Sequence, residues 1–177
     1  MSVRIDIAYE GQLHCSAIHG PSGTQLATDA PKDNQGKGES FSPTDLLATA
    51  LGTCLVTIMG IVAQQGGMDI AGTRVQVVKE MTPPPRRIGR LEVSIVVPKD
   101  KAVRLSAEQR GKLEEASRQC PVCRSIHPDV AATRACHSVR PTERHQAGAG
   151  CEGCGSPVWL DVMSAAAPSL RPGPRLP

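Results

Sequence analysis

Alternating apolar and polar residues mark strands in both halves of the chain, and one long apolar stretch separates the two halves. The segments whose pattern predicts strands are 3–9, 12–18, 24–29, 73–81 and 90–98. Between the third and the fourth of these lies FSPTDLLATALGTCLVTIMGIVA, residues 41–63, which is almost wholly apolar. Strands that are grouped around helices, and do not alternate with them as in βαβ units, predict an α+β fold.

The apolar stretch carries the start and stop signals of a long helix. Ser42 is a preferred N-cap residue, Pro43 suits the first helical position, and Asp45 stands where a capping box has its carboxylate. Two consecutive glycines follow the last apolar turn and can end the helix. The helix should therefore run over 43–65 and measure about 34 Å. Because it is apolar all round, we expect a sheet on one side and a second subunit on another.

A membrane span is the alternative interpretation of the same stretch. LLATALGTCLVTIMGIVA, residues 46–63, contains no charge and reaches the lower length limit of a spanning helix. Three threonines and two glycines interrupt it, and no basic cluster flanks either end. We therefore expect a fully buried helix and no membrane partner.

Helical signals recur after the last predicted strand. SAEQRGKLEEASRQ, residues 106–119, predicts an amphipathic helix with Ser106 as its cap and Gln109 at the reciprocal position of a capping box. A shorter helix can begin at Pro121 and cover 121–128.

From residue 134 onward the chain has no sustained period of a strand or helix and is rich in Ala, Gly, Pro and Arg. This composition predicts one domain over 1–133 and a largely disordered extension over 134–177. VWLDVM, residues 158–163, is the extension's one candidate for an ordered strand.

Composition and charge argue against some classes of function. Tyr9, Phe41 and Trp159 are the only aromatic residues, too few for the base-stacking platforms of single-strand-binding proteins. The net charge of +3 is small and spread out, so we expect no nucleic-acid partner. The N-terminal MSVRIDIAYEGQ lacks the pattern of a signal peptide. We therefore expect a cytoplasmic protein, in which thiols stay reduced unless they do chemistry.

Seven cysteines are many for 177 residues, and two of them allow contrasting interpretations. Cys54, in the middle of the long helix, is either a small hydrophobic residue of the core or a reactive thiol. Cys120 precedes Pro121 and can cap the short helix, whose positive end would favour the thiolate. With Cys123 it forms a C-x-x-C pair, a spacing used by redox dithiols and by metal sites.

A second C-x-x-C pair, Cys151 and Cys154, raises the alternative of a four-thiolate zinc site. The 27 residues between the two pairs exceed the usual separation, and the five histidines show no i, i+4 metal pattern. Cys15 and Cys136 are expected to be incidental. We therefore expect no metal and no cofactor.

The two cysteine motifs carry a family resemblance. GESFSPTDLLATALGTCLVTIMGIVA, followed by KEM, PRRIG and CPVCRSIHPDV, resembles the OsmC/Ohr family, in particular its OsmC-like branch, over about residues 3–133. The resemblance implies an intertwined homodimer with an OsmC-like fold, in which antiparallel sheets wrap around long central apolar helices. It also implies that the core is built around the Cys54 thiol.

By the same resemblance, the protein is a thiol-dependent peroxidase that reduces organic hydroperoxides in oxidative-stress defence. Cys54 matches the peroxidatic cysteine of the family and Cys120 the resolving one. The Cys54 thiolate would attack the peroxide, and its sulfenic acid would condense with Cys120 to a disulfide within one subunit. An external dithiol would then restore the pair. Such a bridge requires the short helix at 121–128 to pack against the middle of the long helix.

The sequence departs from the best-studied hydroperoxide reductases around the reactive cysteine. Those proteins supply an arginine from the N-terminal strands and a glutamate just after the motif proline. Here the acid comes one position later, as Asp45, and no arginine occurs between residues 4 and 74. Arg86 or Arg87 is our candidate for the activating cation.

The sequence allows three alternatives to this interpretation. Cys123 competes with Cys120 as the resolving thiol. The missing arginine and glutamate allow a non-catalytic dimer that binds a small apolar ligand between its central helices. The two C-x-x-C pairs allow a zinc-binding module.

Overall fold

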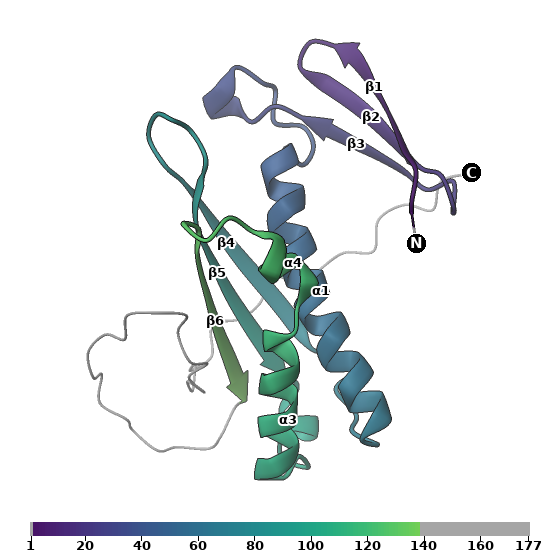
Figure 1. The fold of residues 1–177 in the computed structure, drawn as a ribbon, viewed down its shortest axis with the longest axis vertical. Helices are drawn as coiled ribbons and strands as arrows, with labels where there is room; N and C mark the ends of the chain where they lie inside the picture. The colour runs from purple at the N-terminus through teal and green to yellow at the C-terminus, as the bar shows by residue number, and fades with distance from the viewer. Residues whose placement is uncertain (1, 139–177) are drawn as a thin grey trace.

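The computed structural model describes residues 2–138, which form two three-stranded sheets and a layer of helices (Figure 1). The strands are β1 (Ile5–Gly11), β2 (His14–His19), β3 (Gln25–Asp29), β4 (Arg74–Met81), β5 (Ile88–Val97) and β6 (Ala131–Ser138). The helices are η1 (Lys32–Asn34), α1 (Pro43–Gln65), α2 (Lys99–Ala102), α3 (Ala107–Arg118) and α4 (Pro121–Ser125). The predicted α+β class is confirmed, and the extension from residue 139 lies outside the described residues.

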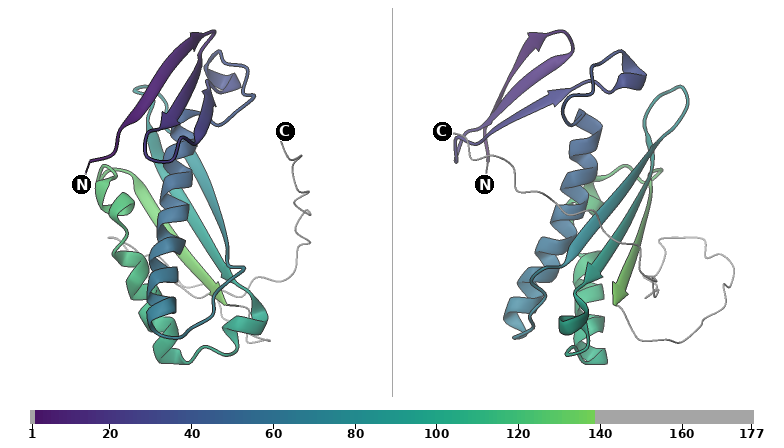
Figure 2. Two further views of the ribbon diagram at one scale, coloured as in Figure 1. Left: turned by 90° about the vertical axis from the view of Figure 1, so that its right-hand side faces the viewer. Right: turned by 180° about the vertical axis from the view of Figure 1, so that it is seen from behind.

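The first sheet is antiparallel in the order β1-β2-β3 and stands beyond the N-terminal end of α1 (Figures 1 and 2). Its three strands are the three that the sequence predicts before the long helix. The apolar side chains of β1 are exposed, with Ile7 at 71% and Tyr9 at 65%. This sheet therefore has no covering layer within the described chain.

The second sheet has the order β4-β5-β6 and corrects the prediction that the sheets are antiparallel. β4 and β5 are antiparallel, with Val77 opposite Val93, but β5 and β6 are parallel, with Val93 opposite Arg134. Parallel neighbours need a long crossover connection, which α2, α3 and α4 supply here. β6 was not predicted, and it runs across the expected boundary between residues 133 and 134.

α1 begins and ends where the sequence predicts. The Ser42 hydroxyl accepts a hydrogen bond from the Asp45 N–H at 3.2 Å, and the Asp45 carboxylate accepts one from the Ser42 N–H at 2.8 Å. The buried positions of α1 follow one face at spacings of three and four residues; they are Ala48, Leu51, Gly52, Leu55, Met59 and Ala63. Leu47 and Ile61, on the opposite side, are 39% and 47% exposed. A single chain thus covers one face of α1 and leaves another apolar face open.

Within residues 2–138, α1 is the one helix long and apolar enough to cross a membrane, judged by length and composition alone. The core helix of a soluble protein meets the same criteria, so length and composition do not distinguish a membrane span from a core helix.

The core lies between the second sheet and the helices α1 and α3, which lie on one face of that sheet (Figures 1 and 2). Alternate residues of β5 point into it; they are Leu91, Val93, Ile95 and Val97, each at most 3% exposed. α3 starts at the predicted cap, where Ser106 and Gln109 form a reciprocal capping box. The short α4 packs against α1, as predicted, and ends at Ser125.

Candidate functional site

Three thiols gather where α4 packs against α1. Cys54 comes from the middle of α1, Cys120 is the residue just before α4, and Cys123 lies within α4. Cys120 has no exposed surface and belongs to the core, whereas Cys54 and Cys123 are half-buried and pack against the same core. The fold therefore brings together the three cysteines that the sequence singles out, and all three are free thiols.

Cys120 caps α4 as predicted. Pro121 takes the first helical position, and the Cys120 Sγ accepts a hydrogen bond from the Cys123 N–H at 3.4 Å. The Cys54 thiol is close enough to act on the ionisation of Cys120. Cys120 thus lies against the Cys123 backbone and near the Cys54 side chain.

The ionisation of Cys120 differs from the expectation. The sequence suggested that the helix end would favour the thiolate, but burial raises the pKa of the Cys120 thiol. The hydrogen bond from Cys123 works in the opposite direction, and the neighbouring Cys54 thiol adds to the increase. Burial prevails because it withdraws the whole side chain from water, while a five-residue helix offers little compensating field. Cys120 is therefore held as a neutral thiol.

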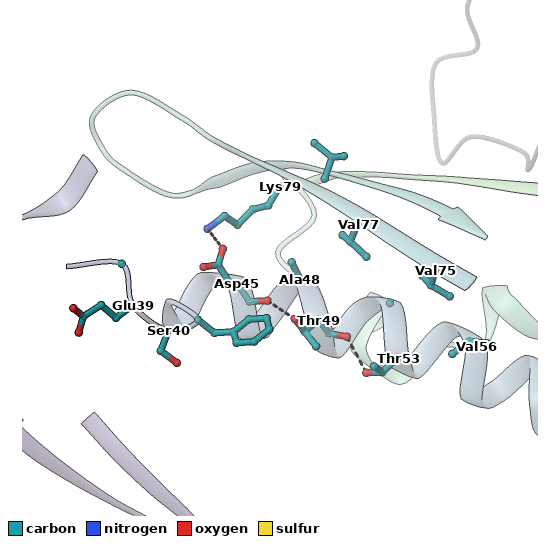
Figure 3. A pocket seen from close by; sticks show the side chains of 14 residues that line it. Glu39, Ser40, Asp45, Ala48, Thr49, Thr53, Val56, Val75, Val77 and Lys79 are labelled. Atoms are coloured by element: carbon teal, nitrogen blue, oxygen red, sulfur yellow. Dashed lines mark hydrogen bonds and ion pairs between the residues drawn. The ribbon is translucent and has the colours of Figure 1, made fainter. Parts of the chain in front are cut away.

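A polar cluster occupies the N-terminal end of α1. Lys79 of β4 forms an ion pair with the Asp45 carboxylate at 2.6 Å (Figure 3). It also donates a hydrogen bond to the Thr44 hydroxyl at 2.8 Å. Partial burial acts to raise the pKa of Asp45, but hydrogen bonds from Lys79 and Ser42 together hold that pKa below its usual value. Asp45 is therefore ionised, and it is bound to the helix cap and to β4.

Sequence reasoning missed Lys79, although the sequence contains a signal for it. In the alternation of β4, Lys79 falls on the same face as Val75 and Val77, which pack toward α1. A lysine on the apolar face of a strand needs a partner, and Asp45 supplies it. At 1.5 Å per residue, the nine residues from Asp45 to Cys54 separate this pair from the thiol by about 13 Å along the helix.

An open cavity of about 970 Å³ lies between the start of α1 and β4 (Figure 3). Its lining includes Thr53 and Val56 of α1, Val75 and Val77 of β4, and the Lys79–Asp45 pair. The thiols do not line it. Gly52 lines the cavity, and Cys54 points in nearly the opposite direction on a helix with 3.6 residues per turn.

Gly52 permits the close approach of α1 to β4 beside this cavity. A Cβ atom at residue 52 would come within 2.8 Å of the Val77 side chain, so a larger residue would push α1 away from the strand. The glycine therefore helps to fix the position of the following turn, which carries Cys54.

The two arginines considered as activating cations have other partners. Arg87 pairs with Asp129 at 3.4 Å, and Arg86 pairs with Asp33 at 2.8 Å. Both pairs lie at the surface, with side chains 38% to 64% exposed. The assignment of Arg87 as the cation beside Cys54 stays a prediction.

Of the two cysteines expected to be incidental, Cys136 has an unexpected location. It lies in β6, is 1% exposed, and burial raises its pKa to about 11. Cys15 lies half-buried in β2. Over residues 2–138, no group of three His, Cys, Asp or Glu side chains is placed to hold a metal ion. Cys151 and Cys154, which the zinc alternative requires, lie outside the described residues.

Comparison with known proteins identifies the family. The family model for the OsmC-like protein matches residues 36–133, a segment that includes the long helix and all three clustered thiols. The chain belongs to the OsmC-like family. No curated protein matches it.

Solved structures share the OsmC-like fold of this chain. A candidate osmotic stress induced and detoxification response protein from Psychrobacter arcticus is 43% identical, with a TM-score of 0.70 over 75% of this chain and 94% of that one. The organic hydroperoxide resistance protein OsmC from Legionella pneumophila is 15% identical, with a TM-score of 0.61 over 78% and 98%. A candidate organic hydroperoxide resistance protein from Vibrio cholerae, with captopril bound in one of the active sites, is 16% identical, with a TM-score of 0.60 over 77% and 91%. At such low identity, the last two show a common fold alone.

Proposed function

We propose that this OsmC-like protein is a thiol-dependent peroxidase that reduces organic hydroperoxides with Cys54 and Cys120. The observation that carries the proposal is the packing of α4 on α1, which brings Cys54 and the fully buried Cys120 to the same core. Two cysteines from distant parts of the sequence thus come together at one apolar core, as a disulfide between them requires. Structural relatives that are called organic hydroperoxide resistance proteins support the substrate class.

The reaction begins at Cys54. Its thiolate attacks the terminal oxygen of the hydroperoxide, the O–O bond breaks, and Cys54 becomes a sulfenic acid. The alkoxide takes up a proton, equivalent to the one that the Cys54 thiol released, and leaves as an alcohol. The Cys120 sulfur then attacks the Cys54 sulfur, so that a disulfide forms and water leaves with the proton of the Cys120 thiol. A neutral Cys120 suits this order, because it leaves the first attack to Cys54. The apolar surroundings favour hydroperoxides with an apolar organic group, and an external dithiol restores both thiols.

A homodimer is the second part of the proposal. Members of the OsmC/Ohr family are typically homodimers. In this chain, Ile5, Ile7 and Tyr9 of β1 are each more than half exposed, and α1 keeps an open apolar face. A second copy of the chain, packed against these apolar surfaces, would remove them from water. We place the dimer in the cytoplasm, where a dithiol reductant is available.

Substitution of Cys54 tests the peroxidase. Cys54→Ser should reduce the consumption of cumene hydroperoxide to the uncatalysed background, while Cys15→Ser, which also removes a half-buried thiol, should match the parent. Cys120→Ser should leave Cys54 as a sulfenic acid that dimedone labels. Turnover by Cys54→Ser at the rate of the parent would exclude the proposed reaction.

The cavity beside α1 favours one alternative function, the binding of a small apolar ligand without catalysis. Its walls include Val56, Val75 and Val77, and its volume of about 970 Å³ is large enough for such a ligand. Native mass spectrometry of the purified protein would favour this function if it showed a bound molecule that Val75→Trp removes. Peroxide turnover by a protein that carries no such molecule would exclude it.

A further inference from the structure

We propose that Cys123 is a third redox thiol of the site. It replaces Cys54 as the disulfide partner of Cys120, and the external dithiol then reduces this second disulfide. This inference rests on the proposed peroxidase function. In it, Cys120 forms its first disulfide with Cys54 and its second with Cys123, so the oxidised pair moves from α1 into α4.

The first argument is the central position of Cys120 among the three thiols. Its Sγ accepts a hydrogen bond from the Cys123 N–H at 3.4 Å, and the Cys54 side chain is near enough to raise the pKa of Cys120. Cys120 and Cys123 have the C-x-x-C spacing of redox dithiols, with Cys120 as the cap of the short helix. Cys120 therefore has a candidate disulfide partner in α1 and another in α4.

The second argument is access. Cys120 is 0% exposed, so an external dithiol cannot attack its sulfur directly. Cys123 is half-buried and is followed in α4 by the exposed residues Arg124 and Ser125. It combines contact with the core and a path to solvent. Cys54 is half-buried as well, so direct reduction at Cys54 is the competing route that an experiment must separate.

The exchange step conserves electrons and atoms. The Cys123 thiolate attacks the Cys120 sulfur, the Cys54–Cys120 bond breaks, and the Cys120–Cys123 bond forms. Cys54 leaves as a thiolate and can take the proton that Cys123 released. The oxidising equivalents come from the organic hydroperoxide of the first step. Cys54 is then free to react with a second hydroperoxide before any reductant arrives.

The exchange should raise the number of hydroperoxide molecules that each chain consumes without reductant. Without reductant, the full-length protein should consume about two cumene hydroperoxide molecules per chain, one for the disulfide and one for a sulfenic acid on Cys54. Cys123→Ser should consume about one, because the Cys54–Cys120 disulfide then has no thiol to exchange with. The matched control Cys15→Ser should consume about two, like the parent.

Disulfide mapping after alkylation, at early and late times, tests the same order on the parent protein alone. The Cys54–Cys120 peptide should appear first and the Cys120–Cys123 peptide should replace it, so the test holds even if a variant fails to fold. A parent that stops at one hydroperoxide and keeps Cys54–Cys120 would overturn the exchange and leave the proposed peroxidase intact. Pairing of Cys54 with Cys123, Cys151 or Cys154 would overturn it too. If no hydroperoxide is consumed and Cys54 stays a thiol, the proposed function itself fails.

Discussion

The two sheets of the molecule contain similar residues in very different surroundings. In β5, Ile95 is 0% exposed beneath the helices, whereas in β1, Ile7 is 71% exposed. Both strands have apolar residues at alternate positions, so the strand pattern alone does not distinguish them. One half of this chain thus completes its own core and holds the three clustered thiols, while the other half offers an apolar surface for a further layer.

The largest expected effect concerns the covered sheet. Ile95→Ala should lower the free energy of unfolding by about 2–5 kcal/mol, because it leaves a cavity beneath α1 and α3. Chemical denaturation should show this loss at every protein concentration. A loss below that range would mean that the core is less tightly packed than the burial of Ile95 indicates.

A smaller effect is expected at the start of α1, where the chain passes from one sheet to the other. Ser42→Ala removes one partner from the capping box and should cost about 0.5–2 kcal/mol. Ser42→Asp should retain most of the lost stability, because a carboxylate oxygen can also accept from the first N–H groups. Thermal denaturation of the two variants side by side makes the comparison; equal losses would assign the effect to packing instead of capping.

The Asp45–Lys79 pair joins the same helix end to the covered sheet and should make stability depend on pH. The folded pKa of Asp45 lies below its unfolded value, so its contribution is present above that value, near 3.8, and is lost as the pH falls through the folded pKa. Because the Asp45 side chain is 40% exposed, we expect less than about 1 kcal/mol. Asp45→Asn should therefore be less stable than the parent at pH 7, and the gap should narrow below pH 4. A gap that stays constant down to pH 2 would contradict the ionised pair.

The smallest effect, in dilute protein, should be that of Ile7→Ala in the bare sheet. A single exposed side chain changes stability by no more than about 0.5 kcal/mol. In the proposed homodimer, the same substitution should weaken association, so the loss should grow with protein concentration. Analytical ultracentrifugation of parent and Ile7→Ala gives the dissociation constants; identical constants would show that the second copy does not cover this sheet.

The parts of the fold that the sequence predicted are those that local chemistry determines. Ser42, Pro43 and Asp45 define the start of α1 through hydrogen bonds among neighbours, and Ser106 does the same for α3. Cys120 caps α4 for the same reason. The proximity of Cys54 and Cys120, by contrast, was expected only from the family resemblance, since no local rule joins residues so far apart.

The features that sequence reasoning missed depend on long-range packing. β6 is held by parallel pairing to β5, and its residues show little alternation of their own. The alternation of β4 places Lys79 on the inner face, but its pairing with Asp45 depends on the offset between β4 and α1, which no pattern within either element reveals. The raised pKa of Cys120 depends on burial by the whole core. The lowered pKa that was predicted from the helix end alone was therefore wrong.

The packing of α4 on α1 also has a consequence for the entropy of the unfolded chain. A bond between residues 54 and 120 would close a long loop and, in the loop-entropy model, stabilise the folded state by about 4 kcal/mol. A bond between residues 120 and 123 closes a very short loop and would contribute only about 2 kcal/mol in the same model. The same degree of oxidation would thus give two folded proteins of different resistance to unfolding. The melting temperature of the oxidised protein would then report which pair of sulfurs is joined.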